Sequence, residues 1–85
     1  MPYQITLIPA AEKQLDGLSK QLQKRVVTKL TGLAQNPRPP DAKALQATEG
    51  LLRVRVGDYR VVYRVVDNPA EVTVIRIAHR SEVYR

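Results

Sequence analysis

The 85-residue sequence contains no cysteine, no tryptophan and no phenylalanine. The absence of cysteine excludes a disulfide framework, a thiolate nucleophile and a cysteine-based zinc site, and it fits a reducing compartment. No apolar run approaches the roughly 20 residues that a membrane-spanning helix needs, and the N-terminus lacks the charged and apolar regions of a signal peptide. We therefore expect a cytoplasmic protein that uses no cofactor or metal ion and has no membrane partner.

Aliphatic residues are abundant where aromatic ones are scarce. Leu, Val and Ile contribute 24 residues, whereas the only aromatic side chains are four tyrosines. A chain of 85 residues leaves no room for a second domain. We expect residues 1–85 to form one small domain around an aliphatic core.

The charge balance is strongly basic. The chain has 14 Lys and Arg against eight Asp and Glu, which gives a formal net charge of +6. Every basic residue after residue 52 is an arginine. Arginine presents a planar fork that suits bidentate contact with phosphate, whereas lysine acts as a mobile point charge. The composition therefore indicates a polyanionic partner such as nucleic acid.

The N-terminal half predicts a strand followed by a helical hairpin. Residues 3–8 alternate as a strand does, and Pro9 ends this strand and opens a helix that runs to residue 18. Ser19 caps a second helix, in which apolar side chains recur at steps of three and four residues: Leu22, Val26, Leu30 and Leu33. Neither helix is long enough to be stable alone, so both must cover a sheet.

The C-terminal half follows a two-residue alternation instead. A proline-rich connection at residues 36–41 ends the second helix, and nine of the eleven valines lie in residues 51–85. Strands are predicted near 51–56, 59–66 and 71–78. The order of strand, helix, helix and three strands predicts an α+β fold, with the helical hairpin packed on a mostly antiparallel sheet of about four strands.

Gly57 and Asp58 separate two alternating runs, which is typical of a two-residue hairpin turn. This turn sets Arg55 directly opposite Arg60. Because side chains alternate across a sheet, one exposed face then carries Arg53, Arg55, Arg60 and Arg64. Opposed like charges destabilise a sheet by a few tenths to about 1 kcal/mol, so stability alone does not explain this placement.

The register of the last strand is less constrained, because the loop at 67–70 can hold different numbers of residues. We expect Ile75 and Ile77 to point inward, which would put Arg76 with the other arginines. The chain then leads out to His79, Arg80 and Tyr84.

Each of these residues also has a purely structural explanation. Arginine is common on the solvated face of an antiparallel sheet, where it blunts aggregation. His79 can be a surface or capping residue, and Tyr84 can be a packing anchor. A solvated helix face accounts for Lys20, Lys24, Arg25 and Lys29, with phosphate contact as the alternative.

Residues 51–63, followed by a valine-rich strand and the segment His-Arg-Ser-Glu-Val-Tyr at 79–84, resemble the RelE/ParE superfamily of bacterial and archaeal toxins. The resemblance covers essentially the whole chain, including the opening strand, the paired helices and an Asn-Pro turn after the second helix. It implies a RelE-type endoribonuclease of a type II toxin–antitoxin system, which enters the ribosomal A site and cuts mRNA. The implied partners are a cognate antitoxin, the ribosome and mRNA.

The arginine cluster and the resemblance together give a candidate site. Its catalytic group comprises Arg55, Arg60, His79, Arg80 and Tyr84, and its RNA-binding group comprises Arg53, Arg64, Arg76, Lys20 and Lys24. RNA cleavage without a metal uses the 2′-OH as nucleophile, and it needs a proton acceptor, cations for the phosphate and an acid for the leaving oxygen. The resemblance implies that Arg60 and Arg80 clamp the phosphate, while Tyr84 orients the nucleophile or stacks on a base.

The basic pair Arg53 and Arg55 departs from the pattern of the family. Relatives often have lysine there, and a lysine with a lowered pKa can act as a base, whereas arginine stays protonated. His79, with an ordinary pKa of about 6.5, is the one side chain suited to exchange protons near neutral pH. We therefore consider it as the general base or acid.

Two other functions remain open at this point. A ParE-like toxin on the same fold would bind and inhibit DNA gyrase without a ribonuclease site, and fold alone does not separate the two. A non-enzymatic RNA-binding module would need only the charge. The combination of Arg55, Arg60, Arg80 and Tyr84, which ParE-like toxins generally lack, favours the ribonuclease.

Overall fold

The computed structural model describes residues 2–45 and 50–83, without the side chains of residues 82 and 83. Its elements, in chain order, are β1 (Gln4–Leu7), α1 (Pro9–Asp16), α2 (Lys20–Gln35), β2 (Lys43–Ala44), β3 (Leu51–Val56), β4 (Tyr59–Asp67), β5 (Ala70–His79) and α3 (Arg80–Val83). The predicted order of one strand, two helices and three long strands is confirmed. The two-residue strand β2 and the short helix α3 were not predicted.

The two long helices begin where the sequence indicates. Pro9 occupies the first turn of α1, where its missing N–H has no intrahelical partner to lose. Ser19 caps α2, because its hydroxyl oxygen accepts a hydrogen bond from the backbone N–H of Leu22 at 3.2 Å. The buried residues of α2 are Val26, Leu30 and Leu33, the apolar stripe expected from their spacing. No helix of the described residues is long and apolar enough to span a bilayer.

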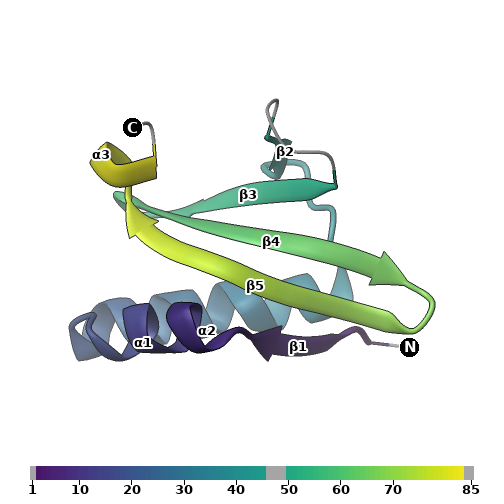
Figure 1. The fold of residues 1–85 in the computed structure, drawn as a ribbon, viewed down its shortest axis with the longest axis horizontal. Coiled ribbons are helices and arrows are strands. Elements are labelled where there is room, and N and C mark those ends of the chain that lie inside the picture. The colour runs from purple at the N-terminus through teal and green to yellow at the C-terminus, as the bar shows by residue number, and fades with distance from the viewer. Residues whose placement is uncertain (1, 46–49, 84–85) are drawn as a thin grey trace.

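The sheet has five strands in the order β1-β5-β4-β3-β2. Strand β1 pairs with β5 in parallel, and the other neighbours are antiparallel. Figure 1 shows α1 and α2 together on one side of this sheet, with α3 at the far end of β5. The α+β class and the mostly antiparallel sheet are therefore confirmed, with five strands instead of about four.

The turn at Gly57 and Asp58 fixes the register between β3 and β4. Val56 pairs with Tyr59 and Arg55 with Arg60, as predicted. Gly57 has φ +60°, a backbone conformation that glycine adopts without steric penalty and that suits the first central position of a two-residue hairpin.

A Gly57→Ala substitution is expected to lower the free energy of unfolding by roughly 1–2 kcal/mol, because an L side chain is strained at positive φ. A Cβ there would also lie 3.2 Å from a guanidinium nitrogen of Arg25. The measurement is urea-induced unfolding of both proteins. Gly32→Ala, within α2 and facing open space, is the control and should stabilise the fold by up to about 1 kcal/mol. Equal effects of the two changes would contradict the role of the turn.

Strand β5 contains a bulge that shifts the predicted faces. Val62 pairs with Arg76 while Tyr63 pairs with Val74, so Ile75 is an extra residue between them. The prediction that Ile75 points into the core is wrong: the core cluster contains Val74 and Ile77 but not Ile75. Ile77 is buried as predicted. Arg76 lies across from Val62 and so shares its face with the other arginines, as the prediction had it.

Candidate functional site

The sheet face turned away from α1 and α2 gathers the arginines of three strands. The register places Arg55, Arg60 and Ala78 in one row across β3, β4 and β5. A second row carries Lys43, Arg53, Val62 and Arg76, and a third carries Leu51, Arg64 and Thr73. We call this surface the arginine face, with Arg53, Arg55, Arg60, Arg64 and Arg76 as its members.

Like charges stand directly opposite each other at two places on the arginine face. Arg55 opposes Arg60, and Lys43 of β2 opposes Arg53. Like charges in such a pair repel each other, because paired side chains in antiparallel strands have Cβ atoms only about 4.5–5.5 Å apart. Sequence reasoning missed Lys43, since a strand of two residues leaves no alternation to detect. The repetition of like-charge pairs on one surface makes this surface the candidate site for an anionic ligand.

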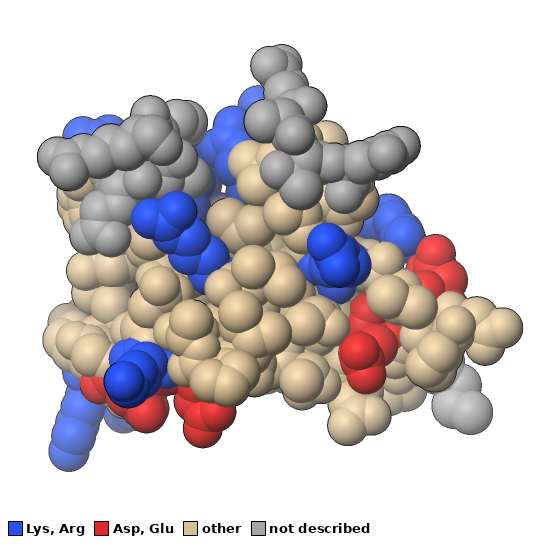
Figure 2. All heavy atoms as spheres, in the orientation of Figure 1, with Lys and Arg blue, Asp and Glu red and all other residues tan. Residues whose placement is uncertain are grey.

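Among the described strands, one acidic residue shares the arginine face. On the described strands, Glu71 shares the arginine face through its pairing with Val66, beyond the third row. Its carboxylate accepts a hydrogen bond from Thr73 at 3.3 Å. In Figure 2 basic side chains lie over the middle and upper part of the molecule and also at its lower left, while acidic ones lie at the lower left and at the right. Glu71 is thus at the opposite end of the face from the pair Arg55 and Arg60 beside the hairpin turn.

The arginines differ in exposure, which the sequence did not indicate. Arg55, Arg64 and Arg76 are exposed and Arg53 is half-buried, but Arg60 is only 5% exposed. The expectation of a uniformly exposed cluster is wrong for Arg60, which lies between Arg55 and the buried Ala78 on neighbouring strands. Burial raises the strength of electrostatic interactions, so Arg60 would act on a bound anion more strongly than an exposed arginine.

His79 does not share the face of the arginines. It pairs with Tyr59 of the opposite face, and the two rings meet edge to face with centroids 5.5 Å apart. Its Nδ1 accepts a hydrogen bond from the backbone N–H of Ser81 at 3.3 Å and lies 3.0 Å from the hydroxyl of Ser81. His79 thus caps the start of α3, the capping alternative that its position allowed.

Arg80 lies near the hairpin end of the arginine face. It is the first residue of α3, which packs against β4 and β5, and its side chain is exposed. Its backbone N–H donates to the carbonyl oxygen of Asp58 in the hairpin turn, at 2.8 Å. This bond ties α3 to the turn that connects the strands of Arg55 and Arg60. Tyr84, the remaining catalytic candidate, lies outside the described residues.

The two lysine candidates are apart from this cluster. Lys20 and Lys24 lie on α2, on the helical side of the sheet, and both are exposed. Lys24 lines a groove between α2 and the hairpin, and Arg55 lines the same groove from the edge of the sheet. Lys24 therefore shares a groove with Arg55 of the arginine face. Lys20, at the start of α2, is not among the residues that line this groove.

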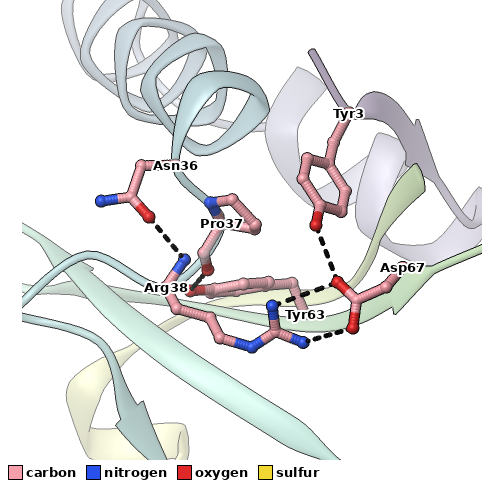
Figure 3. A network of polar contacts seen from close by, with 6 residues as sticks. All are labelled: Tyr3, Asn36, Pro37, Arg38, Tyr63 and Asp67. Atoms are coloured by element: carbon pink, nitrogen blue, oxygen red, sulfur yellow. Dashed lines mark hydrogen bonds and ion pairs between the residues drawn. The ribbon is translucent and has the colours of Figure 1, made fainter. Parts of the chain in front are cut away.

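A second polar network lies at the other end of the sheet (Figure 3). Arg38 donates two hydrogen bonds to the carboxylate of Asp67, at 3.2 and 3.1 Å, and the hydroxyl of Tyr3 donates to the same carboxylate at 2.7 Å. The buried hydroxyl of Tyr63 donates to the carbonyl oxygen of Pro37 at 2.7 Å, and burial raises the pKa of Tyr63 to about 12. These bonds join the residue before β1, strand β4 and the segment after α2, so their role is structural.

The ion pair of Asp67 predicts an acid-dependent loss of stability. Hydrogen bonds from Arg38, and then from Tyr3, hold the pKa of Asp67 below its ordinary value of 3.8. Because the pKa of Asp67 is lower in the folded than in the unfolded protein, its ion pair stabilises the fold at pH values above the unfolded-state pKa. This stabilisation is lost as the pH falls through the folded-state pKa. We expect Asp67→Asn to be less stable than the wild type at pH 7 and the difference to narrow by pH 3, in urea unfolding at both pH values.

Arg38→Gln removes the other partner of the same pair and should reproduce this pattern. The effect is expected to be small, because both side chains are exposed to solvent. A difference between Asp67→Asn and the wild type that is constant from pH 7 to pH 3 would contradict the assignment.

Metal-binding residues are not clustered in the described part of the chain. No group of three or more His, Cys, Asp or Glu side chains there could hold a metal ion.

Comparison with known proteins places the chain in a family. A family model described as the ParE toxin of the type II toxin–antitoxin system parDE matches residues 5–84. The chain belongs to this toxin family. The matched segment includes the whole arginine face, both long helices and the segment that begins at His79.

Relatives of this toxin carry RelE names. It is 35% identical to Toxin RelE of Mycobacterium tuberculosis over 85 residues, which cover 99% of this chain and 88% of that protein. Toxin RelG of the same organism is 29% identical, with 100% and 99% covered. These similarities cover at least 99% of this chain and 88% and 99% of the two relatives, and they confirm the resemblance to the RelE/ParE superfamily.

Solved structures show the same fold. The RelE–RelB complex of Pyrococcus horikoshii superimposes with a TM-score of 0.82 at 28% identity, covering 94% of this chain and 97% of that one. A RelBE toxin–antitoxin complex of Mycobacterium tuberculosis gives 0.82 at 30% identity, covering 95% and 94%. The isolated RelE toxin of Escherichia coli gives 0.81 at 28% identity, covering 96% and 90%. The two complexes contain a toxin together with its antitoxin.

Proposed function

We propose that this toxin is a ribosome-dependent endoribonuclease that cleaves mRNA in the ribosomal A site. The observation that best supports the proposal is the alignment of two opposed like-charge pairs, Arg55–Arg60 and Lys43–Arg53, on one face of the sheet. Like charges that repel each other across paired strands attract a phosphodiester backbone that lies over them. The toxin would act in the cytoplasm, where the ribosomes are, and a cognate antitoxin would silence it.

The arginine face would supply charge and position for the reaction. The 2′-OH of the nucleotide before the cut attacks the adjacent phosphorus, the bond to the 5′-oxygen breaks, and a 2′,3′-cyclic phosphate forms. Negative charge gathers on the phosphate oxygens in the transition state, and preorganised donors stabilise it. We assign the scissile phosphate to Arg55 and Arg60 at the hairpin end, with Arg80 at the start of α3 beside them.

The second and third rows would hold the flanking backbone. Arg53, Arg64 and Arg76, with Lys43, continue the positive surface away from the hairpin. Contacts of this kind fix the register of the strand without reading its sequence. Tyr84 would orient the nucleophile or stack on a base. Lys20 and Lys24 would contact RNA outside the A-site codon.

His79 has a different role in this proposal. Its Nδ1 caps α3 and its ring packs on Tyr59, on the face opposite the arginines. We therefore propose that it positions α3 and Arg80 and does not accept the proton of the nucleophile. Arginine stays protonated and cannot accept it either. Proton transfer would then depend on groups that the ribosome contributes, which fits a reaction that requires the ribosome.

Inhibition of DNA gyrase is the second candidate, because the matching family model carries the ParE name. The experiment that separates the two incubates the purified chain with translating ribosomes and, separately, with gyrase and relaxed plasmid. The proposal predicts mRNA cuts at ribosome-occupied codons and normal supercoiling. Intact mRNA together with blocked supercoiling would select the gyrase inhibitor.

A further inference from the structure

The end of β5 extends beyond the strand that pairs with its outer edge. Strand β1 pairs with residues 71–74 of β5, and the N–H of Ile8, just after β1, donates to the carbonyl oxygen of Val74 at 3.1 Å. Strand β5 continues to His79. In the part of the chain that the structure describes, no strand pairs with residues 75–79 on the side away from β4. The backbone groups on this side of β5 therefore need other partners.

Gln14 of α1 is such a partner. Its side-chain carbonyl oxygen accepts a hydrogen bond from the backbone N–H of Ile77 at 2.7 Å. Helix α1 packs against β5, Gln14 is half-buried and Ile77 is buried. A side-chain amide carries the same carbonyl and N–H groups as a peptide bond. Gln14 therefore replaces one residue of a neighbouring strand at the place where β1 has ended.

This hydrogen bond depends on the bulge in β5. The carbonyl of Val74 and the N–H of Ile77 both point to the edge away from β4. Backbone groups alternate between the two edges of a regular antiparallel strand, so groups three residues apart would point to opposite edges. The extra residue Ile75 accounts for the difference. The bond to Gln14 therefore favours the bulged register over the regular one.

The same register decides where the chain goes after β5. Arg80, the first residue of α3, follows Ile77 by three residues, and its N–H donates to the carbonyl oxygen of Asp58 at 2.8 Å. The end of β5 and the start of α3 are thus held from two sides, by Gln14 and by Asp58. A slip of one residue in β5 would turn its side chains to the other face and move Arg80 relative to the hairpin turn.

We propose that Gln14 is a positioning residue, which holds the bulged end of β5 and thereby places Arg80 beside Arg55 and Arg60. The proposal rests on the proposed nuclease function, in which Arg80 acts on the scissile phosphate. Helix α1 lies on the side of the sheet opposite the arginine face (Figure 1), so Gln14 does not contact RNA and acts through Arg80. Donors to a transition state must be held in place before the reaction, which gives this distant hydrogen bond a catalytic consequence.

The test compares two variants of Gln14. Gln14→Leu removes the acceptor and keeps the bulk of the side chain, whereas Gln14→Glu keeps an acceptor at the same distance from the backbone. Single-turnover cleavage of mRNA on programmed ribosomes, at increasing toxin concentration, gives the rate at saturation and the half-saturating concentration. Gln14→Leu should lower the rate at saturation roughly tenfold and leave the half-saturating concentration unchanged within about twofold. Gln14→Glu should cleave within about threefold of the wild-type rate.

Ser19→Ala is the matched control for stability. It removes a hydrogen bond of the same kind, from the N–H of Leu22 to a side-chain oxygen, at the start of α2. Both Ser19→Ala and Gln14→Leu should unfold at a lower urea concentration than the wild type, but Ser19→Ala should cleave mRNA at the wild-type rate. If Gln14→Leu does not fold, Gln14→Asn, which shortens the side chain by one methylene group, takes its place.

Hydrogen exchange of the ¹⁵N-labelled free toxin tests the positioning without ribosomes. In Gln14→Leu the backbone amides of Ile77 and Arg80 should exchange roughly ten times faster than in the wild type or in Ser19→Ala. A double variant tests the route to the reaction. Adding Gln14→Leu to Arg80→Ala should slow cleavage by no more than about twofold further, because the side chain through which Gln14 acts is already absent.

Three results would overturn the proposal. The first is an Arg80 amide that exchanges at the wild-type rate in Gln14→Leu. The second is cleavage by Gln14→Leu at the wild-type rate or at the rate of Ser19→Ala. The third is a tenfold loss that persists when Arg80 is already alanine. A wild-type toxin that leaves ribosome-bound mRNA intact would instead refute the nuclease assignment itself, so the two failures are distinguishable.

Discussion

An Arg55→Ala variant is expected to cleave ribosome-bound mRNA roughly 10²–10³ times more slowly than the wild type, the loss typical of removing one donor to a developing oxyanion. The same change should leave the fold at least as stable as the wild type. We expect its free energy of unfolding to be unchanged or higher by a few tenths to about 1 kcal/mol, because the repulsion between Arg55 and Arg60 is removed. The measurements are single-turnover cleavage on programmed ribosomes and urea unfolding.

A substitution that lowers activity without lowering stability indicates that the side chain is placed for function and not for folding. Arg55→Lys keeps the charge but loses the planar fork, so its activity should lie between those of the alanine variant and the wild type. Lys13→Ala, the control on α1, should cleave normally. If Arg55→Ala cleaves at the wild-type rate, or if it loses stability in proportion to its loss of activity, the arginine face has no catalytic role.

A Leu33→Ala variant is expected to lose about 2–5 kcal/mol of unfolding free energy, the usual result of removing a buried leucine side chain. Leu33 is 1% exposed and lies on the face of α2 that packs against the sheet. Small domains have only about 5–15 kcal/mol in total, so this single change would remove a large part of the stability. Urea unfolding of both proteins gives the difference in unfolding free energy, with the same dependence of this free energy on urea concentration for both.

Val27→Ala provides the matched control on the same helix. Val27 is 51% exposed, and its truncation should change the stability by no more than about 0.5 kcal/mol. Comparable losses at Leu33 and Val27 would show that α2 does not pack on the sheet through the stripe of Val26, Leu30 and Leu33.

The parts of the fold that could be predicted are those set by local chemistry. Ser19 caps α2 through its own side chain, and the turn at Gly57 and Asp58 fixes the pairing of β3 with β4 by its length alone. Side chains alternate between the two faces outward from that turn, which puts the arginines of β3 and β4 on one face. Alternation and capping act within a few residues, so a single sequence reveals them.

The parts that could not be predicted depend on contacts between distant segments. The bulge at Ile75 lets Val74 and Ile77 both reach the core, and only the packing of β5 against the helices decides its position. The burial of Arg60 likewise results from its place in the middle of the sheet beside Ala78. The pairing of Lys43 with Arg53 is a further example, because β2 has two residues and shows no alternation of apolar and polar side chains that would predict a strand.

The placement of His79 in the candidate site could not be predicted from the sequence either. Its residue type suggested proton transfer, since histidine titrates near neutral pH. Its register with Tyr59 places it on the face opposite the arginines, and its Nδ1 accepts a hydrogen bond from Ser81 at the start of α3, so its role in the reaction stays a proposal. The direction of a side chain at the end of a strand depends on the bulge before it, and this bulge has no sequence signature.

The most direct test of a nuclease site on the arginine face uses ribosomes that carry an mRNA with a single 2′-deoxynucleotide at the nucleotide before the cut. The account predicts that the wild-type toxin cuts the all-ribose message and leaves a 2′,3′-cyclic phosphate, while the deoxy-substituted message stays intact at that position. Cleavage of the deoxy-substituted message at the same position would contradict the account, because the attacking group would then not be the 2′-OH that the arginines are proposed to serve.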